Sequence, residues 1–387
     1  MLADMSDSTT SPTTSGPEGG PTTSRFTQVA VRRRALRWLV PAGAVGVVAL
    51  LGSGVLSADA NTNLAPQTAA QLLASVADTK VTGFSGTVVE KAALGLPELP
   101  NLGGSGSSSN LLGMLTGSHT VRVWYGGETK QRLALVDALG EQDVFRNGRD
   151  LWQWDSQTRT ATHSVLPSDT AKPPPAHTPA ITPAEAAAEA LALIDPTTTI
   201  ATDRTDSVAG RSTYTLVLTP KDTRSRVGSV RISLDGKTRM PLRVVVTARG
   251  SDHAAIDVSF TQVRFAVPDD DNFIFKPPAG AKAPQETKAP SHPGPGSADA
   301  KAAAAGYTTI GTGWTTVVKV TGVPSLTALA KDSGQAGQLL GALPSVSGSW
   351  GSGRLFTSSL MSALITDDGR AYIGAVDPEL LYQAAAK

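Results

Sequence analysis

The sequence predicts an exported protein of the α+β class in which antiparallel strands dominate. Apolar and polar residues alternate, with the two-residue period of half-buried strands, through much of residues 84–276. Glycine-containing pairs typical of hairpin turns separate these runs, as at Gly126-Gly127 and Asn147-Gly148. Two short stretches, residues 68–79 and 183–194, have helical signals instead. The larger part of the chain is therefore expected to be an antiparallel meander with two helices.

The N-terminal segment is not part of this fold. Residues 1–34 are rich in Ser, Thr, Pro and Gly, and we predict that they form a disordered cytoplasmic tail. An uncharged run from Trp38 to Ala58 follows, and at ~1.5 Å per residue a helix of this length spans roughly 30 Å, the thickness of a bilayer core. We assign residues 35–58 to a transmembrane anchor or a signal segment. Its N-terminal side is kept cytoplasmic by four arginines: Arg32, Arg33, Arg34 and Arg37.

Two fates of this segment stay open. If residues 38–58 are retained, the protein is a single-pass protein of the cytoplasmic membrane with its C-terminal domains on the extracytoplasmic side. Residues 58–60 also have the small-x-small pattern of a signal-peptidase site. Cleavage there would give a secreted product.

Composition and motifs exclude several classes of function. The chain has no cysteine, which rules out disulfides, thiol nucleophiles, Cys-ligated zinc and a lipid-modified N-terminal Cys. Its formal net charge of +1 offers no electrostatic footprint for nucleic acid. The five histidines stand singly, and no hydrolase elbow, HExxH or dinucleotide motif occurs. Residues 235–238, Asp-Gly-Lys-Thr, resemble the end of a phosphate loop, but Arg231 takes the place of its required glycine. We predict no enzyme, no metal and no cofactor.

The second helix divides the strands into two groups. It is predicted to begin with Thr182 as N-cap and Pro183 at the first position, and to stop at Asp195-Pro196. Strands before it occupy residues 84–95 and 119–166. Strands after it begin at residue 211 and close with a short aromatic strand in "NFIFKPP", residues 272–278.

Apolar residues in the second group occupy every other position, so they share one face. Polar residues such as Arg231 and Asp257 occupy the opposite face. The apolar face is either a packed core or a cavity that holds hydrocarbon. It is predicted to be formed by Leu216, Leu218, Ile232, Val244, Val246, Val258 and Phe260.

Two other clusters have alternative interpretations. Trp152 and Trp154 stand two residues apart, so both point to one face of their strand, where they line a cavity or fill a core. Residues 269–271 are three consecutive aspartates, which are calcium ligands or, more commonly, a solvated turn.

A Pro/Ala-rich stretch beginning at Pro277 separates a small C-terminal unit, and we assign residues 283–306 to a semi-rigid linker. Residues 307–387 are predicted to form an α+β domain. It contains a helix within residues 325–343, a hairpin around Asp368-Gly369 and a closing helix with Asp377 as N-cap.

The order of these motifs resembles the superfamily of periplasmic lipoprotein carriers and sigma-E regulators, the LolA-like and RseB-like proteins. The likeness covers residues 66–282 and rests on an Asn-Gly-x-x-x-Trp run, a strand ending in Thr-Pro-Lys, a Pro-Leu strand and the closing "FTQVRFAVPDDDNFIFKPPAGAK". It implies a curved, unclosed antiparallel sheet, a half-barrel, with helices as a lid over its concave face. The closing aromatic segment would be its last edge strand.

The resemblance also implies a function. We expect residues 66–282 to bind lipid or the acyl chains of a lipoprotein on the outer side of the cytoplasmic membrane, as a LolA-like carrier or presenter without enzymatic activity. An export transporter would be a fitting partner. The alternative is an RseB-like regulator of envelope stress that acts by contact with a membrane anti-sigma factor.

Overall fold

The computed structural model describes the residues in the following ranges: 64–77, 79, 81–95, 117–137, 140–166, 182–194, 196–282, 284–286, 306–322 and 341–387. The expected cytoplasmic tail, the anchor or signal segment, most of the linker and most of the helix expected within residues 325–343 lie outside these ranges. In the described part of the chain, no helix is both long and apolar enough to cross a membrane.

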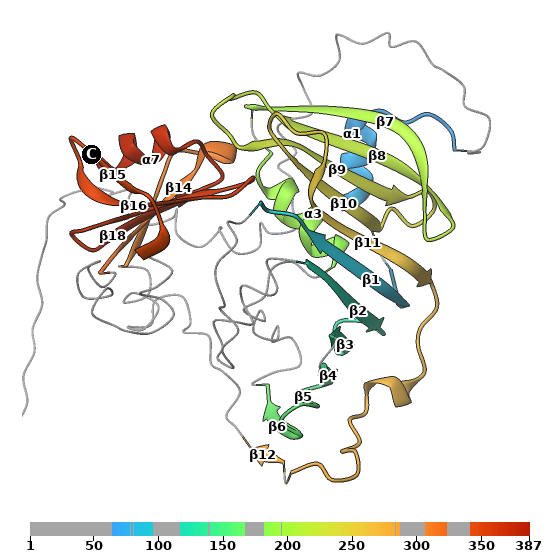
Figure 1. Ribbon diagram of the computed structural model, residues 1–387. Helices are drawn as coiled ribbons and strands as arrows, with labels where there is room; N and C mark the ends of the chain where they lie inside the picture. Colours follow the sequence, from blue (N-terminus) through green and yellow to red (C-terminus); the bar gives the residue numbers. More distant parts are fainter. Residues whose placement is uncertain are drawn as a thin grey trace, which may run out of the picture. The chain divides into compact units, whose positions relative to one another are not determined.

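A twelve-stranded sheet forms the larger body, in the order β12-β6-β5-β4-β3-β2-β1-β11-β10-β9-β8-β7 (Figure 1). All neighbours pair antiparallel except β12, which is parallel to β6. The end strands β12 and β7 do not pair with each other, so the described sheet is unclosed, as expected. Its strands are β1 (Phe84–Ala92), β2 (Gly117–Tyr125), β3 (Lys130–Asp137), β4 (Gly140–Asn147), β5 (Asp150–Asp155), β6 (Thr160–Val165), β7 (Thr198–Val208), β8 (Arg211–Pro220), β9 (Val227–Asp235), β10 (Pro241–Ala248), β11 (Ala254–Arg264) and β12 (Gln285–Glu286).

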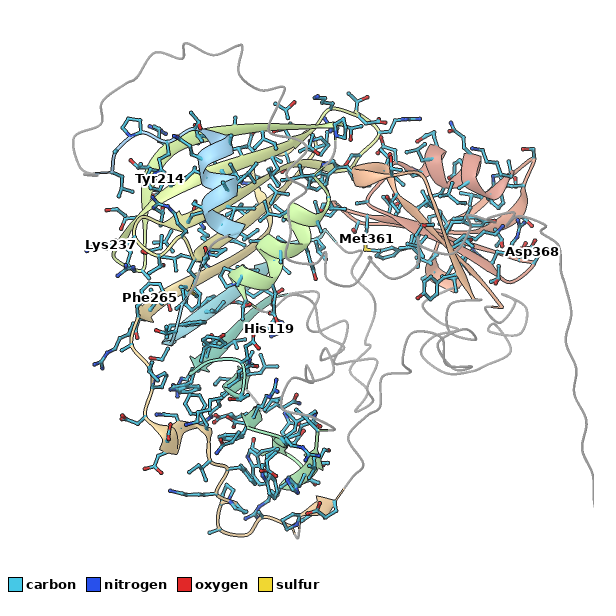
Figure 2. The ribbon with its side chains drawn as sticks, turned by 180° about the vertical axis from the view of Figure 1, so that it is seen from behind. His119, Tyr214, Lys237, Phe265, Met361 and Asp368 are labelled. Atoms are coloured by element: carbon cyan, nitrogen blue, oxygen red, sulfur yellow. The ribbon has the colours of Figure 1, made fainter. Side chains whose placement is uncertain are left out.

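The two faces of this sheet differ in chemistry. We call the face that carries Leu216 and Val244 the inner face, and the opposite face, which carries Arg231 and Asp257, the outer face. Helices α1 (Ala69–Ala77) and α3 (Pro183–Ala192) lie on one side of the strands (Figure 2). Leu72 of α1 and Ala187 of α3 are buried in the same apolar cluster as Leu216, so both helices cover the inner face.

Helix α3 begins where the sequence predicts. The Thr182 hydroxyl accepts a hydrogen bond from the Glu185 backbone N–H (3.3 Å), and the Glu185 carboxylate accepts one from the Thr182 N–H (3.1 Å). This capping box satisfies two backbone donors that a helix start leaves free, and Pro183 needs no such partner. The predicted N-cap is confirmed.

A second sheet of six strands forms the C-terminal domain, in the order β13-β14-β18-β17-β16-β15. Helix α7 (Pro378–Ala385) packs on this sheet and buries Leu381 beside Tyr372. Asp377 stands at the N-cap position as predicted, although its side chain makes no capping hydrogen bond. The predicted hairpin is confirmed as β17 and β18. The strands are β13 (Tyr307–Ile310), β14 (Val317–Thr321), β15 (Ser345–Gly348), β16 (Gly351–Thr357), β17 (Ser362–Thr366) and β18 (Arg370–Gly374).

One predicted strand assignment was wrong. Residues 272–278 do not form an edge strand: a 3₁₀ turn, η1 (Asp270–Phe273), is followed by irregular backbone, and the edge position belongs to β12. Two prolines at the end of this segment cannot donate to a ladder, and Phe275 instead packs on the face of the sheet. Residues 150–165 form a hairpin of β5 and β6.

The C-terminal domain makes backbone contacts with the large sheet. The N–H of Arg226 donates to the carbonyl of Ala375 (2.9 Å), and the N–H of Asp377 donates to the carbonyl of Arg224 (2.9 Å). The buried indole N–H of Trp314 donates to the Thr198 hydroxyl (2.8 Å). These hydrogen bonds join two parts of the large sheet, strand β7 and the segment that precedes β9, to the C-terminal domain.

Candidate functional site

Strand register places the seven predicted cavity residues on one face. Leu216 faces Ile232 across β8 and β9, and Ile232 faces Val244 on β10. Val244 in turn faces Val258 on β11. Directly paired residues of an antiparallel sheet point to the same side, as do residues two apart in one strand. Leu218, Val246 and Phe260 therefore share the inner face with these four, as the alternation predicts.

These side chains are enclosed in the structure described. Six of the seven are between 0% and 2% exposed, and Val246 is partly buried. Leu216 and Val244 pack in a cluster with Leu72 of α1 and Ala187 of α3. Val258 and Phe260 belong to a second cluster, which includes Val88, Val121 and Val123.

The apolar face extends beyond the predicted residues. Phe260 faces Val88 on β1, and Val88 faces Val121 on β2. Val121 faces Leu135 on β3. The track continues through Leu133 to Val144 on β4, then becomes polar at Gln153 on β5 and Thr162 on β6. One row of inner-face residues is thus apolar from β8 to β4.

A single carboxylate interrupts this apolar track. Glu90 on β1 is 5% exposed and faces Val258 on one side and His119 on the other. Burial raises the pKa of Glu90, and the nearby His119 partly opposes this. A buried carboxylate on an apolar face is costly, which makes Glu90 a candidate polar contact for a ligand.

Trp152 and Trp154 lie on the outer face. Trp152 pairs with Phe145, and Trp154 pairs with Asp143. Val144, which lies between Asp143 and Phe145 on β4, points to the inner face. The register therefore does not bring the two tryptophans together with the seven apolar residues. Their neighbour is Phe275, whose ring centroid lies 5.1 Å from that of Trp152 and 6.0 Å from that of Trp154.

A hollow of about 320 Å³ lies beside these rings, between β3–β5 and residues 274–278. The Arg132 guanidinium donates to one oxygen of the nearly buried Asp143 carboxylate (2.8 and 3.0 Å) and stacks 4.5 Å from the Phe145 ring. Burial, together with the charge of Asp143, raises the pKa of Glu141. The charged side chains around this hollow are thus already largely paired with one another.

Two lysines form ion pairs with the acidic turn at residues 269–271. The Lys130 ammonium lies 2.7 Å from an Asp270 oxygen, and Lys276 lies 3.7 Å from Asp271. Among the residues that the structure describes, no group of three or more His, Cys, Asp or Glu side chains could hold a metal ion. The arrangement is that of a solvated turn joined to β3 by an ion pair.

The stretch 235–238 forms a structural turn. It joins β9 to β10, and Figure 2 shows Lys237 at this edge of the large sheet. The Asp235 carboxylate accepts hydrogen bonds from the backbone N–H groups of Lys237 (3.1 Å) and Thr238 (2.7 Å) and from the Arg211 guanidinium (3.1 Å). The carboxylate therefore orders the turn itself.

Comparison with known proteins gives matches among solved structures. The chain is similar to MucB and to LolA-superfamily proteins. The complex of Pseudomonas aeruginosa MucA and MucB matches at 18% identity, over 82% of this chain and 96% of that chain, with a TM-score of 0.40. MucB alone matches at 17% identity, over 82% and 96%, with a TM-score of 0.37. The LolA-superfamily protein NE2245 from Nitrosomonas europaea matches at 11% identity, over 54% and 99%, with a TM-score of 0.24.

No family model matches the sequence, and no curated protein matches it. The two groups of solved structures are those that the ordered motifs resemble.

Sequence reasoning missed several inner-face residues. Val121 and Val123 flank Arg122 in an alternating run, so the same signal could have found them, whereas Leu133 begins the unbroken apolar run 133–136. Glu90 could not have been found this way. The pair Glu90-Lys91 does not show which of its two side chains is buried until the pairing with β11 is known.

Proposed function

We propose that the inner face binds the acyl chain of a lipid or lipoprotein, without enzymatic activity. The single observation that supports this most directly is the continuous apolar track from Leu216 on β8 to Val144 on β4. A half-buried sheet of a small domain needs an apolar face only where other elements cover it. Here one row of the face is apolar over eight neighbouring strands, roughly 34 Å at ~4.8 Å per strand.

The two described helices make their main contacts with one part of this track. Helix α1 contacts β7 and β8, and α3 contacts β10 and β11. Over β3 and β4, the side chains of Leu133, Leu135 and Val144 are only partly buried. An acyl chain would lie along this partly covered region and extend toward the helices, which act as its lid. Burial of each CH₂ group contributes ~0.8 kcal/mol, so one chain supplies ample binding free energy.

Strands β8–β11 carry the helix-covered part of the proposed acyl-binding face. Its residues are enclosed by α1 and α3, so entry of a chain requires the small side chains of α3, such as Ala187 and Ala190, to move from the sheet. Val246, which is partly buried, marks the margin where the helix-covered region can first open.

Native mass spectrometry of the protein purified from its own membrane tests the proposal. We expect a bound species of lipid mass that organic extraction removes and that a fluorescent fatty acid replaces. A mass equal to the polypeptide alone, together with no binding of the fatty acid by the extracted protein, would contradict it.

A second candidate function is a regulator that acts by contact with a membrane anti-sigma factor. The observation that favours it is the enclosure of Leu216, Ile232 and Val244, which is the state expected of a permanently packed core. The complex of MucA and MucB names the class of partner to test. Pull-down with the extracytoplasmic segment of an anti-sigma factor from the same genome should then succeed with lipid-free protein.

A further inference from the structure

The outer face holds a second hollow, of about 270 Å³, across β11, β1 and β2. Strand register arranges its side chains in two rows of three. One row is Arg264, Ser85 and Trp124, and the next is Gln262, Thr87 and Arg122. The short residues of β1 form the floor of the hollow, and the long residues of both neighbouring strands form its walls.

The shape of this floor is set by Gly86 and a bulge. Gly86 faces inward, where a Cβ atom would lie 2.8 Å from the Phe260 ring and 2.5 Å from the Gln262 carbonyl oxygen. Only glycine lets β1 approach β11 this closely. The register then shifts between Thr87 and Val88, which leaves Thr261 without a strand partner. Such a bulge bends the strand and redirects the side chains beyond it, here Gln262 and Arg264.

The arginines of this hollow differ from the others on the outer face. Arg243 is paired with Asp257 (2.7 Å), Arg132 with Asp143, and Arg231 with Asp203. Within the described residues, no carboxylate forms an ion pair with Arg122 or Arg264. Both side chains are exposed, and both line the same hollow.

The polar groups of this hollow are mostly hydrogen-bond donors. Two guanidinium groups and the Trp124 indole N–H can only donate, and the Ser85 and Thr87 hydroxyls and the Gln262 amide can donate as well. The Trp124 ring is itself held by Arg132, whose guanidinium lies 4.6 Å from the ring centroid. Arg122 also interacts electrostatically with Glu141, although the two form no ion pair. A set of donors with two guanidinium groups that form no ion pair selects an anion with several acceptor oxygens.

We propose that this hollow binds a phosphate group. The two arginines stand at opposite corners of the two rows, about 12 Å apart between Cα atoms from a strand spacing of ~4.8 Å and a rise of ~3.3 Å per residue. Their guanidinium groups therefore approach a central anion from opposite sides. A planar carboxylate is satisfied by one bidentate arginine. A tetrahedral phosphate instead presents oxygens to both arginines and to the hydroxyl groups of the floor. The site goes beyond acyl binding, because it lies on the opposite face of the sheet.

Calorimetric titration of the full-length protein in non-ionic detergent with inorganic phosphate tests this site. We expect saturable binding to one site and at least a tenfold weaker affinity in the double variant Arg122→Gln/Arg264→Gln. The control variant Lys91→Gln/Lys237→Gln removes the same charge from exposed positions outside the hollow and should bind phosphate like the wild type. Equal weakening in both double variants, or no phosphate binding by the wild type, would overturn the proposal.

The source of the phosphate is distinguished by a second titration with water-soluble short-chain phosphatidylglycerol. Binding that is lost in the arginine variant but kept in the lysine variant identifies a lipid headgroup. Binding of inorganic phosphate alone identifies a free phosphate. Binding of an acidic peptide in place of phosphate would overturn the proposal in favour of a protein partner. Because the titration with inorganic phosphate and the arginine variant concern only the outer face, their failure leaves acyl binding on the inner face untouched.

Discussion

The ring of Phe275 lies against that of Trp152, with their centroids 5.1 Å apart and their planes inclined by 31°. This contact explains the aromatic run near the end of the large domain. Residues 272–278 pass over the outer face of β4 and β5, and Phe275 also meets Phe145 (5.3 Å). The segment thus covers aromatic rings that would otherwise face water, while the inner face stays free for the helices.

Removal of the Phe275 ring should loosen this segment without affecting the inner face. We expect Phe275→Ala to lower the free energy of unfolding by about 1–2 kcal/mol, since each aromatic pair contributes ~0.5–1.5 kcal/mol. Tryptophan emission should shift to longer wavelength as Trp152 and Trp154 become hydrated. Ile274→Ala is the matched control, because Ile274 is 44% exposed and should change stability little. A loss of acyl-probe binding in Phe275→Ala would show that the outer face takes part in the inner site.

His163 should make the attachment of β12 depend on pH. Its Nε2 lies 2.8 Å from Asp150 and its Nδ1 lies 3.1 Å from Glu286 of β12. Burial alone would lower the pKa of His163, but the hydrogen bonds to both carboxylates outweigh it and raise the pKa. Only the protonated ring donates to both partners.

The sign of the effect follows from the raised pKa. A group whose folded-state pKa is above its unfolded value of about 6.5 contributes full stability below that pH and loses it as the pH rises through the folded-state pKa. The difference in unfolding midpoint between wild type and His163→Gln should therefore be largest near about pH 6 and shrink toward about pH 9. A difference that is constant or grows with pH would refute the double ion pair. Glu286→Gln should remove part of the pH dependence.

The linker should be open to protease, although the two domains touch. Residues 283–306 are rich in Pro and Ala, which offer no core. Limited proteolysis should give a stable fragment that ends beyond Glu286, because β12 (Gln285–Glu286) pairs with β6 of the large sheet. Because Trp314 and Ala375 are hydrogen-bonded to the large domain, we expect the C-terminal fragment to co-elute with it until denaturant is added. Uniform degradation of the whole chain would contradict the boundary.

The N-terminal segment leads to a separate prediction. If residues 38–58 are a retained anchor, the mature protein begins near Met1 and stays with membranes in a high-salt wash. N-terminal sequencing checks this directly. A soluble product that begins at Asn61 would show that the segment is a cleaved signal peptide.

The inner face was predictable because alternation of apolar residues is a local signal. Leu216, Ile232 and Val244 could be placed on one side of the sheet from their own strands alone. The position of Trp152 could not, because it depends on which side of β5 faces the helices, and that is fixed by pairing through β4, β3 and β2 back to β1. Strand β7 was missed because it is an edge strand whose side chains, such as Thr202 and Asp206, are mostly exposed and polar.

The outer-face hollow that contains Arg122 and Arg264 could not be predicted from the sequence either. Arg122, Ser85 and Arg264 stand far apart in sequence and come together only through two strand pairings. A β-bulge sets their register, and bulges have no reliable sequence signature. Long-range pairing, rather than local pattern, therefore decides both the outer-face site and the boundary of the inner one.

Two tryptophan substitutions on neighbouring inner-face positions of β10 test the central claim, that the inner face admits an acyl chain. Val246 is partly buried at the margin of the helix-covered region, whereas Val244 is 1% exposed within it. We predict that Val246→Trp blocks binding of a fluorescent fatty acid with little change in unfolding midpoint, because its ring fills space that the ligand uses. Val244→Trp should instead overpack the core and cost ~1–3 kcal/mol or more. If the wild type binds no fatty acid, and Val246→Trp lowers the midpoint as much as Val244→Trp does, the face is a packed core and acyl binding is contradicted.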